Sequence, residues 1–340
     1  MPFRVVDGKN EIPETDCVPT TLFLTAGRGQ KCGRCPGSAG HLCCNYLTID
    51  LYEGCPIGCS YCIMKSYLNF KPVTVNVDTE AIGEEMEQLF DRFPGRVFRI
   101  GTGETGDSLF YDPLIELSAD LVARAAVREN VFFELKTKTA YVDHLLSLEP
   151  KGKTVIGFSL NPEVVAAAEE GWAHPLIERL AAAQRAVRAG YLVSFHFDPI
   201  IRISGWEAQY KGVIEQLRVF PAGRIAWISL GTVRYPGELA SRMGERPYLF
   251  DEFVRCRDGK YRYLQPIRVA IYRTMRRLLA KVTSAPVYMC MESPAVWKRV
   301  FGKLPSKIDS LCAIFSNETA PYRFSLTDEM EKPEQEGGTR

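Results

Sequence analysis

The chain has 340 residues, of which 46% are hydrophobic and 24% are charged. This balance describes a globular protein that buries a core the size of one α/β barrel with an appendage. The formal net charge of +1 gives no overall attraction to nucleic acid, so any such binding needs a local basic patch. No apolar run is long enough to span a membrane and the first residues lack a secretory signal pattern, so we expect a cytoplasmic protein.

Strands and helices alternate along most of the sequence. The hydrophobic patterns predict strands at 46–51, 97–101, 131–138, 154–161, 191–199 and 225–233, and helices at 79–93, 112–128 and 175–190. We expect each strand except the last to be followed by a helical stretch, which predicts a parallel sheet with right-handed crossovers. In such a sheet we expect the functional residues to lie at the C-terminal ends of the strands.

The pattern changes beyond residue 240. We predict a hairpin at 248–263 that turns at Asp258 and Gly259, a helix at 266–282, a strand at 286–292 and a helix capped by Ser293. The sequence thus divides into a Cys-rich segment (1–45), a sheet-forming unit (46–235), a C-terminal extension (236–325) and a tail (326–340) that we expect to be disordered.

Eight of the eleven cysteines fall within the first 62 residues. A reducing cytoplasm disfavours disulfides, so clustered thiols indicate metal binding. In "EGCPIGCSYC" (53–62), three cysteines with the spacing C-x3-C-x2-C lie on a turn that Gly54 and Gly58 allow to wrap closely. Three ligands leave one metal position open for chemistry, since structural zinc prefers four. The alternative is a zinc loop completed by Cys43, Cys44 or His41.

The spacing of Cys55, Cys59 and Cys62, with Tyr61 before the third cysteine, resembles the radical S-adenosylmethionine superfamily. The resemblance implies a partial (β/α)6 barrel and a 4Fe-4S cluster held by the three cysteines, with S-adenosylmethionine on the fourth iron. It further implies reductive cleavage to a 5′-deoxyadenosyl radical that abstracts hydrogen from a substrate, and an electron donor such as flavodoxin or ferredoxin.

The stretches "RIGTGETGDSL", "KTKTAYVDHLL", "GKTVIGFSLN" and "AGYLVSFHFDPIIRISGWEAQY" extend the resemblance over roughly 46–210, to the spore photoproduct lyase family of DNA repair enzymes. This resemblance implies that Gly106 and Asp107 lie near S-adenosylmethionine, that Lys138 meets its carboxylate and that Ser159 lies beside the nucleoside. Without this resemblance, the sequence predicts that Asp107 caps a helix and that Lys138 is a solvated charge.

Two positions depart from the family pattern. The family returns a hydrogen atom from a cysteine after the second strand, whereas Glu104 occupies the aligned position here, and a carboxyl O–H bond is too strong to replace a thiol. The family's tyrosine relay is incomplete, because Ile63 follows the third cysteine although Tyr61 is present. Cys290 is a candidate alternative hydrogen donor. The sequence therefore indicates a relative of the lyase with the same radical chemistry and an unassigned substrate.

A second group of cysteines, Cys32, Cys35, Cys43 and Cys44, offers one chelating C-x2-C pair and one adjacent pair. They predict either a second iron-sulfur cluster or zinc site, or small buried side chains leading into the first strand.

Basic residues such as Arg273 and Arg276, with Trp297 and Phe301 interleaved, indicate either a phosphate-contacting surface or a solvated amphipathic face. Three functions stay open on the sequence alone. The first is action on a nucleic acid lesion or related nucleotide, and the second is modification of a small metabolite or peptide with an auxiliary cluster. The third is a non-catalytic zinc or iron-sulfur protein.

Overall fold

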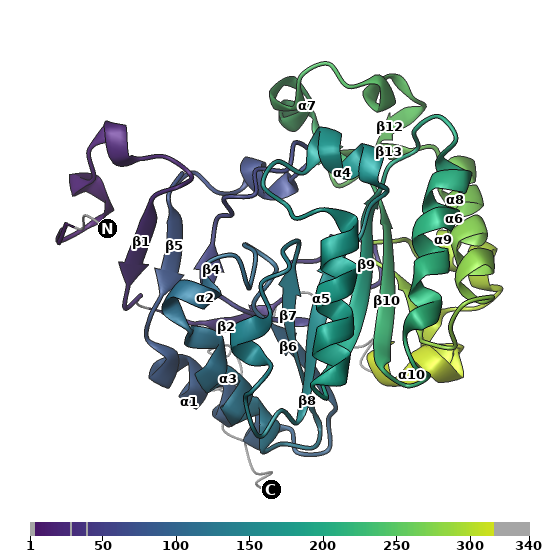
Figure 1. The fold of residues 1–340 in the computed structure, drawn as a ribbon. Helices are drawn as coiled ribbons and strands as arrows, with labels where there is room; N and C mark the ends of the chain where they lie inside the picture. Colours follow the sequence, from purple (N-terminus) through teal and green to yellow (C-terminus); the bar gives the residue numbers. More distant parts are fainter. Residues whose placement is uncertain (1–3, 28, 39, 316–340) are drawn as a thin grey trace, which may run out of the picture.

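The fold is built on a curled eight-stranded sheet (Figure 1). A computed structural model describes residues 4–27, 29–38 and 40–315. The sheet order is β14-β10-β9-β8-β7-β6-β3-β2, and every neighbouring pair is parallel except β2 with β3. Its strands are β2 (Cys32–Arg34), β3 (Leu47–Ile49), β6 (Phe98–Gly101), β7 (Val131–Thr137), β8 (Lys153–Ser159), β9 (Leu192–Ile200), β10 (Ile225–Thr232) and β14 (Val287–Met289). The α/β half-barrel predicted from the sequence is confirmed.

The six predicted strands are β3, β6, β7, β8, β9 and β10. Their runs of apolar residues are buried, as expected for parallel strands covered on both faces. The sheet is wider than predicted, because β2 comes from the Cys-rich segment and β14 from the C-terminal extension. The proposed division of the chain into segments stays a prediction, and the tail at 326–340 lies outside the described residues.

Amphipathic helices cover the outer face of the curled sheet (Figure 1). They are α1 (Thr79–Arg92), α2 (Asp112–Ile115), α3 (Leu117–Ala126), α4 (Glu163–Glu169), α5 (Leu176–Arg188), α6 (Trp206–Glu215) and α8 (Gln265–Leu279). Asp78 caps α1 by accepting a hydrogen bond from the Ala81 N–H at 3.1 Å.

Two helix predictions were wrong in detail. The single helix expected at 112–128 is broken into α2 and α3, because Glu116 adopts a left-handed conformation with φ of 53°. Between β7 and β8 the chain forms only a 3-10 turn (Asp143–Leu145), not the expected helical crossover. The other 3-10 turns are Lys9–Glu11, Glu14–Asp16, Ile63–Ser66, Gln216–Val219, Pro247–Phe250 and Pro305–Lys307.

Two small sheets flank the half-barrel. The first joins β1 (Leu22–Thr25), β5 (Val73–Asn76) and β4 (Tyr52–Glu53), and the second joins β11 (Arg234–Pro236), β13 (Lys260–Tyr263) and β12 (Phe253–Arg255). The predicted hairpin at Asp258 and Gly259 is confirmed by the antiparallel pairing of β12 with β13. The remaining helices are α7 (Gly237–Met243), α9 (Pro294–Phe301) and α10 (Asp309–Phe315).

A seam between the Cys-rich segment and the C-terminal extension joins the loop between β2 and β3 to the segment after β14. The Leu42 N–H donates to the Glu292 carbonyl oxygen at 2.9 Å, in an isolated antiparallel bridge. The Glu292 carboxylate is itself buried and pairs with the Arg268 guanidinium at 2.9 Å. The seam thus connects a residue between β2 and β3 to a residue that follows β14.

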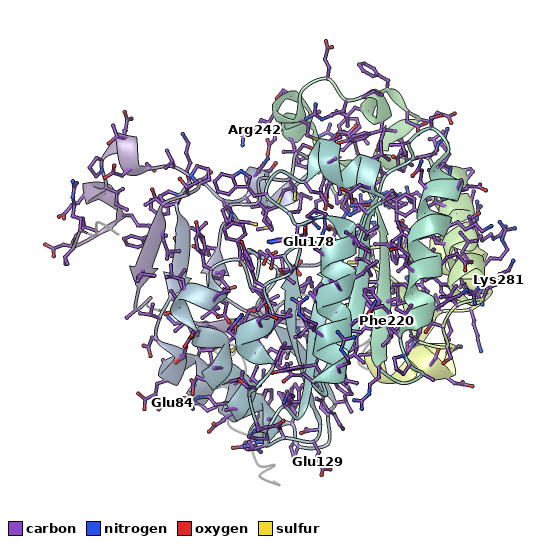
Figure 2. All side chains as sticks on the ribbon, viewed as in Figure 1. Glu84, Glu129, Glu178, Phe220, Arg242 and Lys281 are labelled. Atoms are coloured by element: carbon purple, nitrogen blue, oxygen red, sulfur yellow. The ribbon has the colours of Figure 1, made fainter. Side chains whose placement is uncertain are left out.

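Two arginines of the basic C-terminal extension form hydrogen bonds with the backbone of the same extension. Arg273 and Arg276 donate to the carbonyl oxygens of Arg299 and Val300, which end α9. Trp297 is fully buried, so it belongs to the core and not to a phosphate-contacting surface. Figure 2 shows the charged side chains of Glu84, Glu129 and Lys281 at the outer surface of the molecule.

Candidate active site

A cavity of about 670 Å³ opens at the C-terminal ends of the barrel strands. Its volume lies in the range of small-molecule and cofactor pockets. The predicted site residues that line it are Cys35, Cys44, Cys55, Cys59, Tyr61, Cys62, Glu104, Gly106, Asp107, Lys138, Ser159 and Cys290. The structure therefore brings together residues that lie more than two hundred positions apart in the sequence.

The three-cysteine loop follows β4 and forms one wall of the cavity. Gly54 and Gly58 have φ of 89° and 75°, so both turns of the loop use backbone conformations that favour glycine. Cys59 is almost fully buried, and all three thiols face the same space. The spacing read from the sequence thus becomes three sulfurs on one tight turn.

The segment 169–172 holds this loop in place through backbone hydrogen bonds. The Ser60 N–H donates to the Glu169 carbonyl oxygen at 2.8 Å, and the Trp172 N–H donates to the Ile57 carbonyl oxygen at 2.9 Å. A Cβ added at Gly171 would lie 2.3 Å from the Ile57 carbonyl oxygen, so a larger residue does not fit there without movement. Sequence reasoning did not identify this segment as a partner of the cysteine loop.

Tyr61 and Lys138 meet at the buried carboxylate of Glu170. The Tyr61 hydroxyl donates to Glu170 Oε1 at 2.5 Å, while Lys138 Nζ lies 3.8 Å from the same oxygen. Arg179 Nη2 donates to Glu170 Oε2 at 2.6 Å. Burial opposes the charge of this carboxylate, but the two cations outweigh it and lower the pKa of Glu170 to about 2.

Asp107 has its carboxylate occupied by local donors. Asp107 Oδ1 accepts from the N–H groups of Leu109 and Phe110 at 3.0 Å, and from the Thr137 hydroxyl at 2.8 Å. Asp107 Oδ2 accepts from the Lys138 N–H at 2.7 Å. These contacts support a role in positioning the loop after β6 against the end of β7, and its contact with S-adenosylmethionine stays a prediction.

Gly106 and Ser159 line the cavity at places where neighbouring segments pack closely against their backbone. A Cβ at Gly106 would lie 2.7 Å from the Gly54 carbonyl oxygen, so a side chain there collides with the base of the cysteine loop. The Ser159 carbonyl oxygen accepts from Arg179 Nη1 at 2.8 Å, which fixes the end of β8. Their predicted proximity to S-adenosylmethionine is consistent with this placement and stays a prediction.

Glu104 pairs with Lys136 and contacts a cysteine of the N-terminal segment. Lys136 Nζ lies 3.3 Å from Glu104 Oε2, and the Cys35 Sγ donates to Glu104 Oε1 at 3.4 Å. Burial opposes the charge of Lys136, but Glu104 and nearby groups raise the pKa of Lys136 well above its ordinary value. Cys35 was not expected to contact Glu104, since 69 positions separate them.

The four N-terminal cysteines do not share one environment. Cys32 is buried on β2 and its N–H donates to Glu85 Oε1 at 3.0 Å, whereas Cys35 and Cys44 line the cavity and Cys43 does not. Within the described ranges, no three His, Cys, Asp or Glu side chains are arranged to hold a single metal ion. Cys32 on β2 thus lies apart from the cavity that Cys35 and Cys44 line, and a second metal site at these cysteines stays a prediction.

Two further side-chain pairs line the cavity, and neither pair was predicted from the sequence. His196 Nε2 lies 2.8 Å from Glu134 Oε1, and Trp227 Nε1 donates to the same oxygen at 3.1 Å. Burial opposes ionisation of Glu134, but His196 and nearby cations lower its pKa below the ordinary range. The only available signal was an acid within the apolar run "VFFELKT". Asp198 and Arg234 form the second pair at 3.0 Å.

The residues of the cysteine loop fit an iron-sulfur cluster better than a single ion. A cubic 4Fe-4S cluster binds each cysteine at a separate iron, so its ligands stand further apart than those of one metal ion. Three thiols on one wall with a cavity beyond them are what a cluster with an additional ligand requires. The donor set and the shape of the site thus agree.

A curled parallel half-barrel with such a loop at its C-terminal end defines the radical S-adenosylmethionine class of fold. The family model for spore photoproduct lyase matches residues 9–225. This match covers more than half of the chain, and the chain belongs to the spore photoproduct lyase family.

Curated relatives support the same placement. The chain is 26% identical over 215 residues to spore photoproduct lyase of Bacillus subtilis (strain 168), covering 63% of this chain and 61% of the relative. It is 27% identical over 215 residues to spore photoproduct lyase of Geobacillus sp. (strain Y412MC61), with the same coverage. The chain thus spans about three fifths of the length of the curated relatives it matches.

Solved structures share the fold. Spore photoproduct lyase complexed with dinucleoside spore photoproduct superposes with a TM-score of 0.71 at 22% identity, covering 85% of this chain and 88% of that chain. A spore photoproduct lyase variant with bound AdoMet and dinucleoside spore photoproduct gives a TM-score of 0.71 at 24% identity, covering 85% and 87%. Among the helices that the structure describes, none has the length and apolar character to cross a membrane.

Proposed function

We propose that this chain is a radical S-adenosylmethionine enzyme that acts on a nucleic acid lesion or a related nucleotide substrate. In this proposal Cys55, Cys59 and Cys62 hold a 4Fe-4S cluster. When bound, the cluster and S-adenosylmethionine supply a 5′-deoxyadenosyl radical, after an electron arrives from a donor such as flavodoxin or ferredoxin. The observation that carries the proposal is that three thiols of one turn face a cavity at the C-terminal ends of the barrel strands.

The chain's own residues position and shield this chemistry. Lys138 lines the cavity with a side chain that is 14% exposed, and it provides a positive charge for a carboxylate of the bound cofactor. Glu170 contacts both Lys138 and Tyr61. It therefore keeps these two side chains beside the cysteine loop. Gly106 allows the loop after β6 to pack directly against the base of the cysteine loop, because a Cβ there would lie 2.7 Å from the Gly54 carbonyl oxygen.

The substrate class rests on the family and on the relatives' ligand. Spore photoproduct lyase binds dinucleoside spore photoproduct in a solved structure with the same fold. Here the cavity carries Glu104 paired with Lys136, and Asp198 paired with Arg234, which offer hydrogen-bonding groups to a polar base or sugar. A nucleotide with altered base chemistry is the substrate class that this lining supports.

Anaerobic reconstitution followed by iron, sulfide and product analysis tests the proposal. We expect about four irons per chain and reductive formation of 5′-deoxyadenosine from S-adenosylmethionine. Replacing Cys55, Cys59 or Cys62 with alanine should abolish both the binding of the four irons and the formation of 5′-deoxyadenosine. C256A is the matched control, because Cys256 lies in the hairpin away from the lining of the cavity. Zinc without sulfide, or cleavage retained in C59A, contradicts the assignment.

A further inference from the structure

Three more thiols line the cavity at the seam of the half-barrel, and we call them the seam thiols. Cys35 follows β2, Cys44 precedes β3 and Cys290 follows β14. The Cys290 N–H donates to the Leu230 carbonyl oxygen at 2.8 Å, which extends the pairing of β14 with β10. The Cys35 N–H donates to the Tyr46 carbonyl oxygen at 3.0 Å, which extends the pairing of β2 with β3. Backbone structure therefore fixes two of these thiols in position.

The seam thiols lie close enough to influence one another electrostatically. After burial and Glu104, both Cys290 and Cys44 raise the pKa of Cys35. Burial and Asp198 likewise raise the pKa of Cys290 well above its ordinary value, with Cys44 and Glu104 among the other contributors. Burial of Cys35 and Cys290 therefore favours the neutral S–H form of these thiols over the thiolate in the metal-free chain.

Cys35 differs from the other two because a fixed partner orients it. Its Sγ lies 3.4 Å from Glu104 Oε1, and Lys136 holds the other oxygen of that carboxylate at 3.3 Å. Cys35 also lines the cavity. A protonated thiol held at the wall of a reaction cavity has the chemistry of a hydrogen-atom donor.

We propose that Cys35 delivers a hydrogen atom to the carbon radical formed in this cavity, with Cys44 and Cys290 as neighbouring thiols of the same group. The inference rests on the proposed function, because it requires a radical reaction. The S–H bond breaks homolytically and a C–H bond forms, so that the substrate radical becomes a closed-shell product and Cys35 becomes a thiyl radical. One electron from the low-potential donor that reduces the cluster, with one proton from water, restores the thiol.

The step is favourable because an S–H bond is weaker than the C–H bonds of a methyl group or a sugar. A carboxyl O–H bond is stronger, so Glu104 does not serve as the donor. Its place beside Cys35 suits an orienting role instead, since the S–H···O contact directs the thiol proton and keeps the side chain at the cavity wall.

Isotope transfer from solvent tests the inference, because thiol protons exchange with water. The reconstituted full-length enzyme is incubated in D2O with S-adenosylmethionine, dithionite and dinucleoside spore photoproduct, without added thiol. A parallel reaction omits the dinucleoside, so that the 5′-deoxyadenosyl radical is itself the acceptor. Mass spectrometry then measures deuterium in the nucleoside product and in 5′-deoxyadenosine.

We expect deuterium in the carbon-bound position for the wild type, and a several-fold loss of it in C35A and C35S. C35S retains the size and hydrogen bond of the side chain, so it separates loss of the S–H bond from misfolding. C256A should behave as the wild type, and iron content checks each variant. Unchanged deuterium in both Cys35 variants, in both reactions, overturns the inference. A wild type that forms no 5′-deoxyadenosine overturns the proposed function, and the inference with it.

Discussion

The Tyr61 hydroxyl donates to the Glu170 carboxylate at 2.5 Å, across 109 positions of sequence. This contact ties the cysteine loop to the segment after α4, and two cations share the same carboxylate. The loop that presents the thiols is therefore braced by a buried charge cluster on the next wall of the half-barrel. The stability of the site depends on that cluster.

We predict that E170Q lowers the free energy of unfolding by about 3 kcal/mol, because it leaves Arg179 and Lys138 without their buried counter-charge. The variant should also retain less iron after reconstitution, since the cysteine loop loses its brace. Denaturant unfolding and iron analysis measure the two effects. E178Q, at an exposed position of α5, is the matched control, and an E170Q as stable as E178Q contradicts the prediction.

The same carboxylate predicts an acid-dependent component of stability. The pKa of Glu170 is lowered from its ordinary value of 4.5 to about 2, so its stabilising effect is complete above about pH 4.5 and is lost as the pH falls toward 2. The difference in unfolding free energy between wild type and E170Q should therefore shrink between these values. Denaturant midpoints of both iron-free proteins across that range measure it, and a constant difference rejects the explanation.

We predict that G106A destabilises the protein by about 1–3 kcal/mol, because its new Cβ lies 2.7 Å from the Gly54 carbonyl oxygen and 2.9 Å from Tyr52 Cβ. Relief of the clash moves the base of the cysteine loop, so cluster incorporation should fall as well. G212A provides the control, because nothing lies within 4 Å of its Cβ in α6. Equal thermal midpoints and iron contents for the two variants would show that the close approach is unimportant.

Asp112 organises the break between α2 and α3. Asp112 Oδ1 accepts from the Tyr52 hydroxyl at 3.1 Å and from the Ser118 N–H at 3.0 Å, and Oδ2 lies 2.7 Å from His144 Nε2. D112N keeps one acceptor oxygen and should cost about 1–3 kcal/mol, since a buried partner is left unsatisfied. Thermal unfolding against E129Q, at an exposed loop position, measures this cost. A D112N midpoint equal to that of E129Q refutes it.

The barrel strands could be predicted from sequence because each is a local run of buried apolar residues, and the cysteine loop because its spacing is itself local. The break at Glu116 could not, since a glutamate gives no sign of its left-handed backbone. Strand β2 carries no apolar pattern and depends on pairing with β3. The seam thiols were individually visible, but their grouping depends on contacts between opposite ends of the chain.

The Leu42 to Glu292 bridge joins the Cys-rich segment to the C-terminal extension through one backbone hydrogen bond. Strands β2 and β14 are the two edges of the large sheet, where backbone donors and acceptors are open to further pairing, and the bridge lies beside both edges. Removal of the segment around Leu42 is therefore expected to loosen the chain around Glu292, and the reverse should hold as well.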